Sequence, residues 1–218
     1  MTDFEKVAKN VLPEKSWVNA SSSAATGLSM KTNLDDWSLI NFRPRILRSV
    51  DSMDTRRNIL GTPLSSPISF RLWCRSLPPK KLGAGLAENA RDSHGENDFT
   101  PEFGSWQVPG SVDGGLTWVD LDWISSEWDG PLVLRGIQSV EDVKLAVQHG
   151  VQGILLSNRG GRQILFAPSS LMPFLDNRTY YSEAFDKLQV FVDGGLRDGA
   201  DILKALCLGT TAVGVGRP

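Results

Sequence analysis

The sequence predicts an α/β protein with a parallel sheet, and three observations support this fold class. From Leu116 onward, short apolar runs alternate with stretches of helical period. The apolar runs are continuous instead of alternating with polar residues, and glycine or polar residues follow each run. Continuous apolar strands joined by helical crossovers are typical of a parallel sheet covered on both faces. A doubly wound sheet and a (β/α)8 barrel both fit this pattern.

Four strands and three helices account for the second half of the chain. Ser139 and Asp142 form a capping-box-like start to the first helix, and Gly209 closes the last one. Cys207 lies on the apolar side of that last helix and is expected in the core. The predicted strands are 131–137, 151–158, 188–195 and 211–216, and the predicted helices are 139–150, 169–185 and 198–209.

The chain divides into three zones. Residues 1–66 form an N-terminal helical approach segment, whose first helix is amphipathic through Phe4, Val7, Ala8 and Val11. Residues 67–112 show no sustained period, and Pro, Gly and charges are scattered through them. We expect a divergent, poorly ordered insert there. Residues 113–218 carry the strong alternation.

Composition excludes several classes of function. The 218 residues include 23 basic and 25 acidic side chains, so a net charge of -2 gives no field that would concentrate nucleic acid. No run approaches the roughly 18 apolar residues of a membrane span. Two distant cysteines favour a reducing compartment, and two histidines exclude a His-rich metal site. We therefore expect a cytoplasmic protein with no metal, no nucleic acid and no membrane.

Charged residues and glycines gather where the predicted strands end. In parallel α/β folds, ligands bind at the carboxyl ends of the strands. Glycines let the backbone approach an anion closely, and a following helix start favours phosphate. A phosphate cradle at the last two strand ends is the natural expectation. The strand-end groups are Arg135-Gly136, Ser157 to Arg162, Asp193 to Arg197 and Gly214 to Arg217.

Two long blocks carry a family resemblance. "LTWVDLDWISSEWDGPLVLRGIQSVEDVKLAVQHGVQGILLSNRGGRQ" and "VFVDGGLRDGADILKALCLGTTAVGVGRP" closely resemble the C-terminal half of the FMN-dependent α-hydroxy acid dehydrogenase/oxidase family. "NFRPRIL" and "MDTRRNILGTPLSSPI" resemble the family's approach to its first barrel strand. The resemblance implies a (β/α)8 TIM barrel that binds FMN and oxidises an L-2-hydroxy acid to a 2-oxo acid.

The resemblance also implies a role for each strand-end residue. Arg135 stands where the family has a lysine near the reduced flavin, and Ser157 matches an FMN contact. Arg162 matches the arginine that pairs with the substrate carboxylate through its planar fork. The matches to ribityl and phosphate contacts of FMN are Asp193, Gly194, Gly195, Leu196, Arg197, Gly216 and Arg217.

One position departs from the family in a way that affects the chemistry. The family motif reads Ser-Asn-His-Gly, and its histidine removes the substrate proton. Here that position is Arg159. Arginine is always protonated in proteins and has no acceptor lone pair, so Arg159 cannot serve as a general base.

The length of the chain points to an incomplete barrel. A TIM barrel typically has about 250 residues, and the family's second to fourth strands have no recognisable counterpart in 71–112. A half-barrel exposes sheet edges and part of its core, and a homo-oligomer would cover them.

Two functions follow from these observations. The first is an FMN-dependent oxidoreductase acting on a small 2-hydroxy acid or similar carboxylate, in a specialised biosynthetic pathway where the pocket has diverged. The second is a catalytically impaired FMN- or anion-binding paralogue or subunit, in which Arg159, Arg162 and Arg197 hold an anion.

Overall fold

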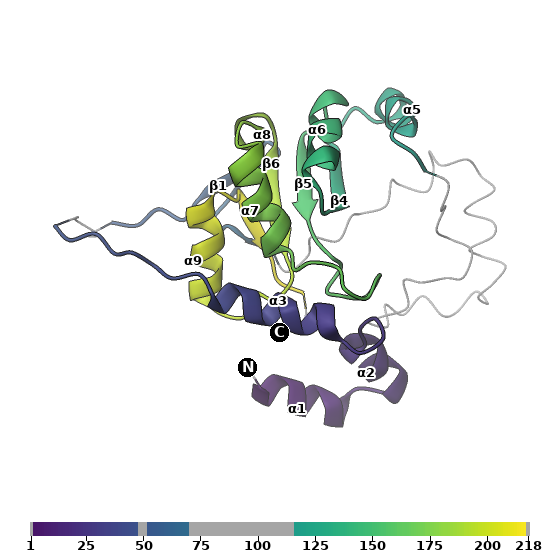
Figure 1. The fold of residues 1–218 in the computed structure, drawn as a ribbon, viewed down its shortest axis with the longest axis vertical. Coiled ribbons are helices and arrows are strands. Elements are labelled where there is room, and N and C mark those ends of the chain that lie inside the picture. Colours follow the sequence, from purple (N-terminus) through teal and green to yellow (C-terminus); the bar gives the residue numbers. More distant parts are fainter. Residues whose placement is uncertain (1, 48–51, 70–115, 217–218) are drawn as a thin grey trace. The chain divides into compact units, whose positions relative to one another are not determined.

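The predicted alternation of strands and helices is present in the computed structural model, which describes residues 2–47, 52–69 and 116–216 (Figure 1). The expected divergent insert lies almost wholly outside the described residues, as does Arg217. The contacts divide the chain into two units. The first contains 22–72 and 130–218, and the second contains 2–21 and 73–129.

The described part of the second unit is helical. Its helices are α1 (Thr2–Val11), α2 (Glu14–Ser21) and α5 (Asp120–Glu127). Helix α1 confirms the amphipathic helix expected at the N-terminus. At the start of α5, a carboxylate oxygen of Asp120 accepts from both the backbone N–H and the hydroxyl of Thr117, at 2.6 and 2.8 Å. No helix in the described part of the chain is long and apolar enough to cross a membrane.

The first unit is built on a five-stranded parallel sheet. Its strands lie in the order β3-β7-β6-β5-β4, and a separate antiparallel hairpin pairs β1 with β2. The strands are β1 (Arg57–Ile59), β2 (Thr62–Leu64), β3 (Ile68–Ser69), β4 (Val133–Ile137), β5 (Gly153–Leu156), β6 (Gln189–Asp193) and β7 (Ala212–Gly214). The helices are α3 (Leu28–Ser38), α6 (Val140–Gln148), α7 (Leu171–Tyr180), α8 (Ala184–Lys187) and α9 (Gly199–Leu208).

The strand order distinguishes between the two architectures that the sequence allows. From β4 to β7 each strand lies beside its predecessor, and the early strand β3 pairs with the last one, Ile68 opposite Val213. A doubly wound sheet would instead reverse its order at a switch point. The sheet is therefore part of a (β/α)8 barrel, including the contact between its first and last strands, and among the described residues the barrel is not closed.

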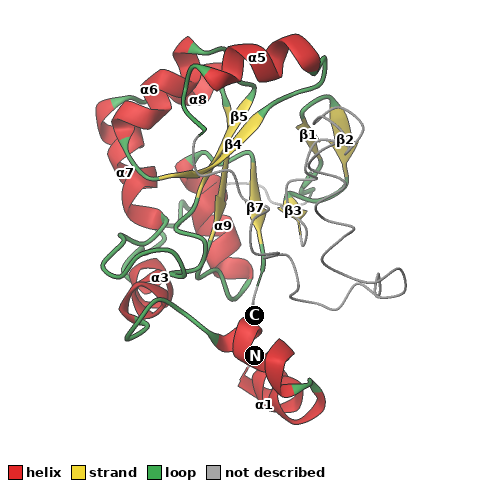
Figure 2. Cartoon of the chain, turned by 90° about the vertical axis from the view of Figure 1, so that its right-hand side faces the viewer, coloured by secondary structure: helices red, strands yellow, loops and turns green. Residues whose placement is uncertain are grey.

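The two faces of the sheet have different covers. Figure 2 shows α6, α7 and α8 on one side of the strands and the β1–β2 hairpin on the other. On the hairpin side, Leu155, Phe191 and Ala212 form a buried cluster against which Ile59 and Leu60 pack. We call this side the inner face, because it corresponds to the interior of a barrel. The hairpin is fixed there by Gln189, whose side-chain carbonyl accepts from the Leu60 backbone N–H at 3.0 Å.

The helix ends confirm the local sequence signals, with one correction. Ser139 accepts a hydrogen bond from the Asp142 backbone N–H at 3.0 Å, and Gly209 caps α9 with a φ of 109°. The expectation that Cys207 lies in the core is wrong, because its side chain is exposed. Helix α9 instead buries Ala205, and two positions along a helix turn a side chain nearly to the opposite face.

Candidate functional site

Strand alternation places three of the predicted site residues on the inner face. Leu155 and Phe191 are paired in register and both belong to the inner-face cluster. Successive side chains point to opposite faces, so Ser157 and Asp193, each two residues further along, continue that face. Arg135 is paired with Leu155 and shares it. An apolar layer therefore lies beneath a polar layer at the carboxyl ends of β4, β5 and β6.

Arg135 and Asp193 form an ion pair in this polar layer. Nη2 of Arg135 lies 3.0 Å from Oδ2 of Asp193, and their side chains are 22% and 14% exposed. The pair spans β5, because β4 and β6 are the strands on either side of β5. The second carboxylate oxygen, Oδ1 of Asp193, is buried and accepts no hydrogen bond from the described protein. It can accept from a hydroxyl group of a ligand.

The electrostatics of Asp193 reflect this partial burial. Burial raises the pKa of the Asp193 carboxyl, while the Ser157 hydroxyl, Arg135 and Arg159 act in the opposite direction. The two arginines thus both contribute positive potential at the end of β6. The four residues form one polar group, which we call the strand-end cluster.

Arg159 enters the cluster in a strained backbone conformation. Its φ is 53°, in the left-handed region that non-glycine residues rarely adopt, and its backbone N–H donates to the Ser157 hydroxyl at 3.0 Å. The side chain passes Gly136 at the end of β4, where a Cβ built on Gly136 would lie 3.9 Å from Nε of Arg159. The residue at the family's base position is therefore a second cation beside Asp193.

Arg162 is separated from Arg159 by two glycines, and its side chain is partly buried. Burial lowers the pKa of its guanidinium from its ordinary value. Arginine titrates so far above neutrality that Arg162 keeps its charge. A partly desolvated guanidinium suits bidentate pairing with a carboxylate.

Two glycines of the strand-end loops lie directly against helix α3. A Cβ at Gly195 would lie 1.8 Å from the backbone oxygen of Asn33, and one at Gly161 would lie 2.6 Å from the backbone nitrogen of Met30. Both glycines have a positive φ. They let helix α3 approach these loops, whereas Gly216, near the end of the described chain, has no atom within 4 Å of its Cβ position.

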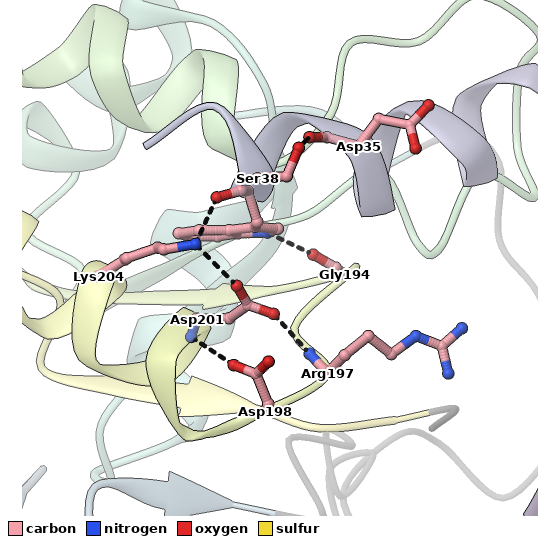
Figure 3. A network of polar contacts seen from close by, with 8 residues as sticks. Asp35, Ser38, Gly194, Arg197, Asp198, Asp201 and Lys204 are labelled. Carbon is pink, nitrogen blue, oxygen red and sulfur yellow. Dashed lines mark hydrogen bonds and ion pairs between the residues drawn. The ribbon is translucent and has the colours of Figure 1, made fainter. Parts of the chain in front are cut away.

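The loop after β6 is held by a polar network that joins α3 to α9 (Figure 3). Trp37 Nε1 donates to the Gly194 carbonyl at 3.0 Å, and Lys204 Nζ donates to the Trp37 carbonyl at 2.7 Å. Lys204 also pairs with Asp201, whose other oxygen accepts from the Arg197 backbone N–H. The predicted contact Leu196 is buried within this loop.

The side chain of Arg197 lies outside this network. Figure 3 shows that it extends away from Asp198 and Asp201, since only its backbone bonds to Asp201. A guanidinium in this position can meet an anion beyond the loop. Arg217, the other arginine expected to bind phosphate, lies outside the described residues.

Helix α3 contributes to these loops in a way that the sequence does not signal. Asn33 and Trp37 are buried against the loops after β5 and β6, with 2% and 1% of their surface exposed. A polar residue in an N-terminal helix carries no sign that it will meet a loop more than a hundred residues away. Asn158, the partner of Asn33, lies within the Ser-Asn-Arg motif, but the motif gives no sign of this contact.

The charged side chains at these strand ends are mostly cations. Among the residues that the structure describes, no three or more His, Cys, Asp or Glu side chains gather as metal ligands. Three cations, one aspartate and a hydroxyl instead suit an anionic or hydroxyl-bearing organic ligand.

A parallel sheet in barrel order defines a (β/α)-barrel protein, with cations and an acceptor at the carboxyl ends of its strands. The chain belongs to the FMN-dependent dehydrogenase family, whose model matches residues 8–71 and 77–218. The match is wider than the resemblance carried by the motifs, because it includes residues 77–112.

Curated relatives agree with this assignment. The chain is 46% identical over 136 residues to "L-lactate dehydrogenase (cytochrome)" of Saccharomyces cerevisiae, covering 60% of this chain and 21% of that protein. It is 43% identical over 304 residues to "2-Hydroxyacid oxidase 2" of Bos taurus, covering 100% and 85%. "Pre-mycofactocin synthase" of Mycolicibacterium smegmatis is 33% identical over 205 residues, covering 91% and 47%.

The length of these alignments bears on the barrel. The bovine alignment extends over 304 residues, well beyond the 218 of this chain, so a substantial internal stretch of that relative has no counterpart here. The chain also spans only about a fifth of the yeast relative.

Solved structures show the same fold. The flavin-binding domain of baker's yeast flavocytochrome b2 matches with a TM-score of 0.76 at 29% identity, covering 100% of this chain and 74% of that one. A flavocytochrome b2 variant with bound pyruvate matches with a TM-score of 0.80 at 27% identity and the same coverage. A mandelate oxidase at 23% identity and a TM-score of 0.77 supports the fold alone.

Proposed function

We propose that this chain binds FMN at the carboxyl ends of β4 to β7, and that the protein oxidises a small 2-hydroxy acid. The observation that carries the proposal is the Arg135–Asp193 pair on the inner face, with the buried acceptor Oδ1 of Asp193 beside it. The family supplies the identity of the cofactor.

The residues present fit FMN chemically. Oδ1 of Asp193 is an acceptor for a hydroxyl such as those of the ribityl chain. Arg135 places a permanent positive charge where a reduced, anionic flavin would be stabilised. Arg197 and the segment around Gly216 are the candidates for the phosphate. When bound, FMN supplies the two-electron acceptor for oxidation of an alcohol.

The substrate class follows from Arg162 and from the relatives. A partly buried guanidinium favours a carboxylate, and the printed names of the relatives refer to lactate, glycolate and 2-hydroxy acids. The remaining expectations also belong to the proposal. A second copy of the chain would cover sheet edges left open by the incomplete barrel, and the two distant cysteines suit a reducing compartment.

The test is anaerobic reduction of the flavin in FMN-loaded protein by glycolate, L-lactate and L-mandelate. We expect at least one acid to bleach the flavin absorbance, with a rate that saturates with acid concentration. Arg162→Met should raise the half-saturating concentration at least tenfold, because it removes the partner of the carboxylate. Arg178→Met is the matched control, since Arg178 belongs to α7 and its guanidinium lies over the Phe185 ring of α8. Protein that holds FMN but is reduced by none of the acids contradicts the proposed reaction.

A further inference from the structure

The loop that carries Arg159 and Arg162 has an unusual backbone. Three successive residues, Arg159, Gly160 and Gly161, have φ values of 53°, 68° and 71°. Glycine adopts this left-handed region without cost, but arginine does so only when its surroundings enforce it. Contacts outside the loop must therefore hold its conformation.

Asn158 provides the first of these contacts. The Gly161 backbone N–H donates both to the Asn158 backbone carbonyl, at 3.1 Å, and to Oδ1 of the Asn158 side chain, at 3.0 Å, so the side chain reinforces the left-handed turn. Its Nδ2 donates to the Pro168 carbonyl at 2.9 Å. The residue is 1% exposed, so these bonds are shielded from bulk water. The side chain adds its acceptor to the turn only when the Asn158 amide faces in this direction.

Asn33 of helix α3 determines that direction. Its Nδ2 donates to Oδ1 of Asn158 at 2.8 Å, and its Oδ1 accepts from Nδ2 of Asn158 at 3.0 Å. A reversed Asn158 amide would set donor against donor and acceptor against acceptor. Asn33 is itself fixed, because its Oδ1 also accepts from the Ser170 backbone N–H at 3.2 Å.

Two further contacts place α3 and the segment before it against the same loop. The Ala24 backbone N–H donates to the Gly161 carbonyl at 2.8 Å. Gly161 also lies so close to Met30 that any side chain there would collide with the helix backbone. The loop is thus shaped against the N-terminal segment, and the paired amides are the side-chain connection between them.

We propose that Asn33 is a positioning residue: through the Asn158 amide it fixes the loop 158–162 and thereby the placement of Arg159 and Arg162. The effect of Asn33 on the conformation of the loop does not depend on the proposed function. The consequence for ligand binding rests on the proposed function, in which Arg162 meets a carboxylate.

The experiment compares Asn33→Asp, Asn33→Ser and Asn33→Ala with the wild-type full chain. Asn33→Asp keeps the acceptor Oδ1, replaces the donor toward Asn158 with an oxygen and adds a carboxyl group that can carry a negative charge. Exchange of the Gly161 backbone amide is followed by NMR. Oxalate, a small dicarboxylate probe, is titrated into the FMN-loaded chain. We expect Gly161 exchange to accelerate at least tenfold and the oxalate Kd to rise at least tenfold.

Asn177→Ala is the matched control. Asn177 is also 1% exposed, but its Nδ2 donates to the Pro173 carbonyl within α7, away from the loop. It should lower stability while leaving Gly161 exchange and the oxalate Kd within about threefold of wild type after correction for global unfolding.

Several results would overturn the proposal. Unchanged Gly161 exchange in the folded Asn33 variants would do so, as would an equal acceleration in Asn177→Ala. Faster Gly161 exchange with an unchanged oxalate Kd overturns the claim that Asn33 affects ligand binding through Arg159 and Arg162. Failure to bind FMN counts against the proposed function only, because the exchange result does not depend on FMN. If no Asn33 variant folds, the wild type decides: the side-chain NH2 protons of Asn33 and Asn158 should be protected, and rapid exchange overturns the proposal.

Discussion

The guanidinium of Arg135, at the end of β4, reaches over β5 and binds the carboxylate of Asp193 at the end of β6, with 3.0 Å between Nη2 and Oδ2. The pair thus ties together three strand ends of the inner face. It also leaves one carboxylate oxygen without a protein donor in the described structure, at the place where a cofactor would enter.

Breaking this pair should destabilise the protein. Arg135→Met leaves the Asp193 carboxylate mostly buried without its cation, and such a loss costs roughly 3 kcal/mol. Arg135→Lys keeps a charge and should cost less. Urea denaturation measures both. Lys187→Met, which removes the exposed pair with Glu183, should cost less than about 1 kcal/mol. Equal losses for the buried and exposed pairs would show that the Arg135–Asp193 pair does not hold the strand ends.

Asp193 should make stability depend on pH in a defined direction. Burial raises the pKa of its carboxyl above the unfolded value of 3.8, so the folded state holds the proton more tightly. The stabilising contribution of Asp193 to the folded state is therefore present below pH 3.8 and is lost as pH rises through the folded pKa. Measured against Asp193→Asn, the wild-type free energy of unfolding should fall across this window. A difference that rises with pH would mean that the two arginines outweigh burial.

Restoring a base should restore proton transfer. Arg159→His introduces an imidazole acceptor at a left-handed position that histidine tolerates better than most residues. Flavin reduction by the best 2-hydroxy acid should accelerate about 10²- to 10⁴-fold. Arg159→Gln removes the same charge without adding a base and should give no such gain. Equal rates for the two variants would show that the absence of a base does not limit the reaction.

The approach of α3 to the β6 loop makes Gly195 intolerant of a side chain. Gly195→Ala would place a Cβ 1.8 Å from the Asn33 carbonyl oxygen at a φ of 82°, so we expect a loss of more than about 3 kcal/mol or failure to fold. Gly199→Ala, at the start of α9, meets no atom within 4 Å and should be neutral or stabilising by up to about 1 kcal/mol. Thermal unfolding compares the two. A folded Gly195→Ala of unchanged stability would refute the close packing of α3.

Much of the fold is predictable because its signals are local. The Ser139 cap, the Gly209 stop and the continuous apolar strands each depend on neighbouring residues, and all are present in the structure. Cys207 was mispredicted because α9 buries a narrower stripe than its composition suggests. The choice between a barrel and a doubly wound sheet depends on strand order, which the alternation of elements does not encode.

Some residues of the site can likewise be predicted from local sequence signals, and others cannot. Arg135, Ser157, Arg159 and Asp193 were predictable as a group because parallel strands bring their carboxyl ends to one edge. The packing of α3 was not, because the contact of Asn33 with Asn158 spans 125 positions and involves two neutral amides. For the same reason, the sequence gives no sign that Gly161 and Gly195 accommodate a helix.

The most direct test of the central claim is the visible absorbance spectrum of the purified full chain after incubation with FMN and extensive dialysis. We expect flavin bands to remain, at close to one FMN per chain, and Asp193→Ala to lose them while retaining its secondary structure. Folded wild-type protein without flavin bands would contradict the claim that the ends of β4 to β7 form an FMN site.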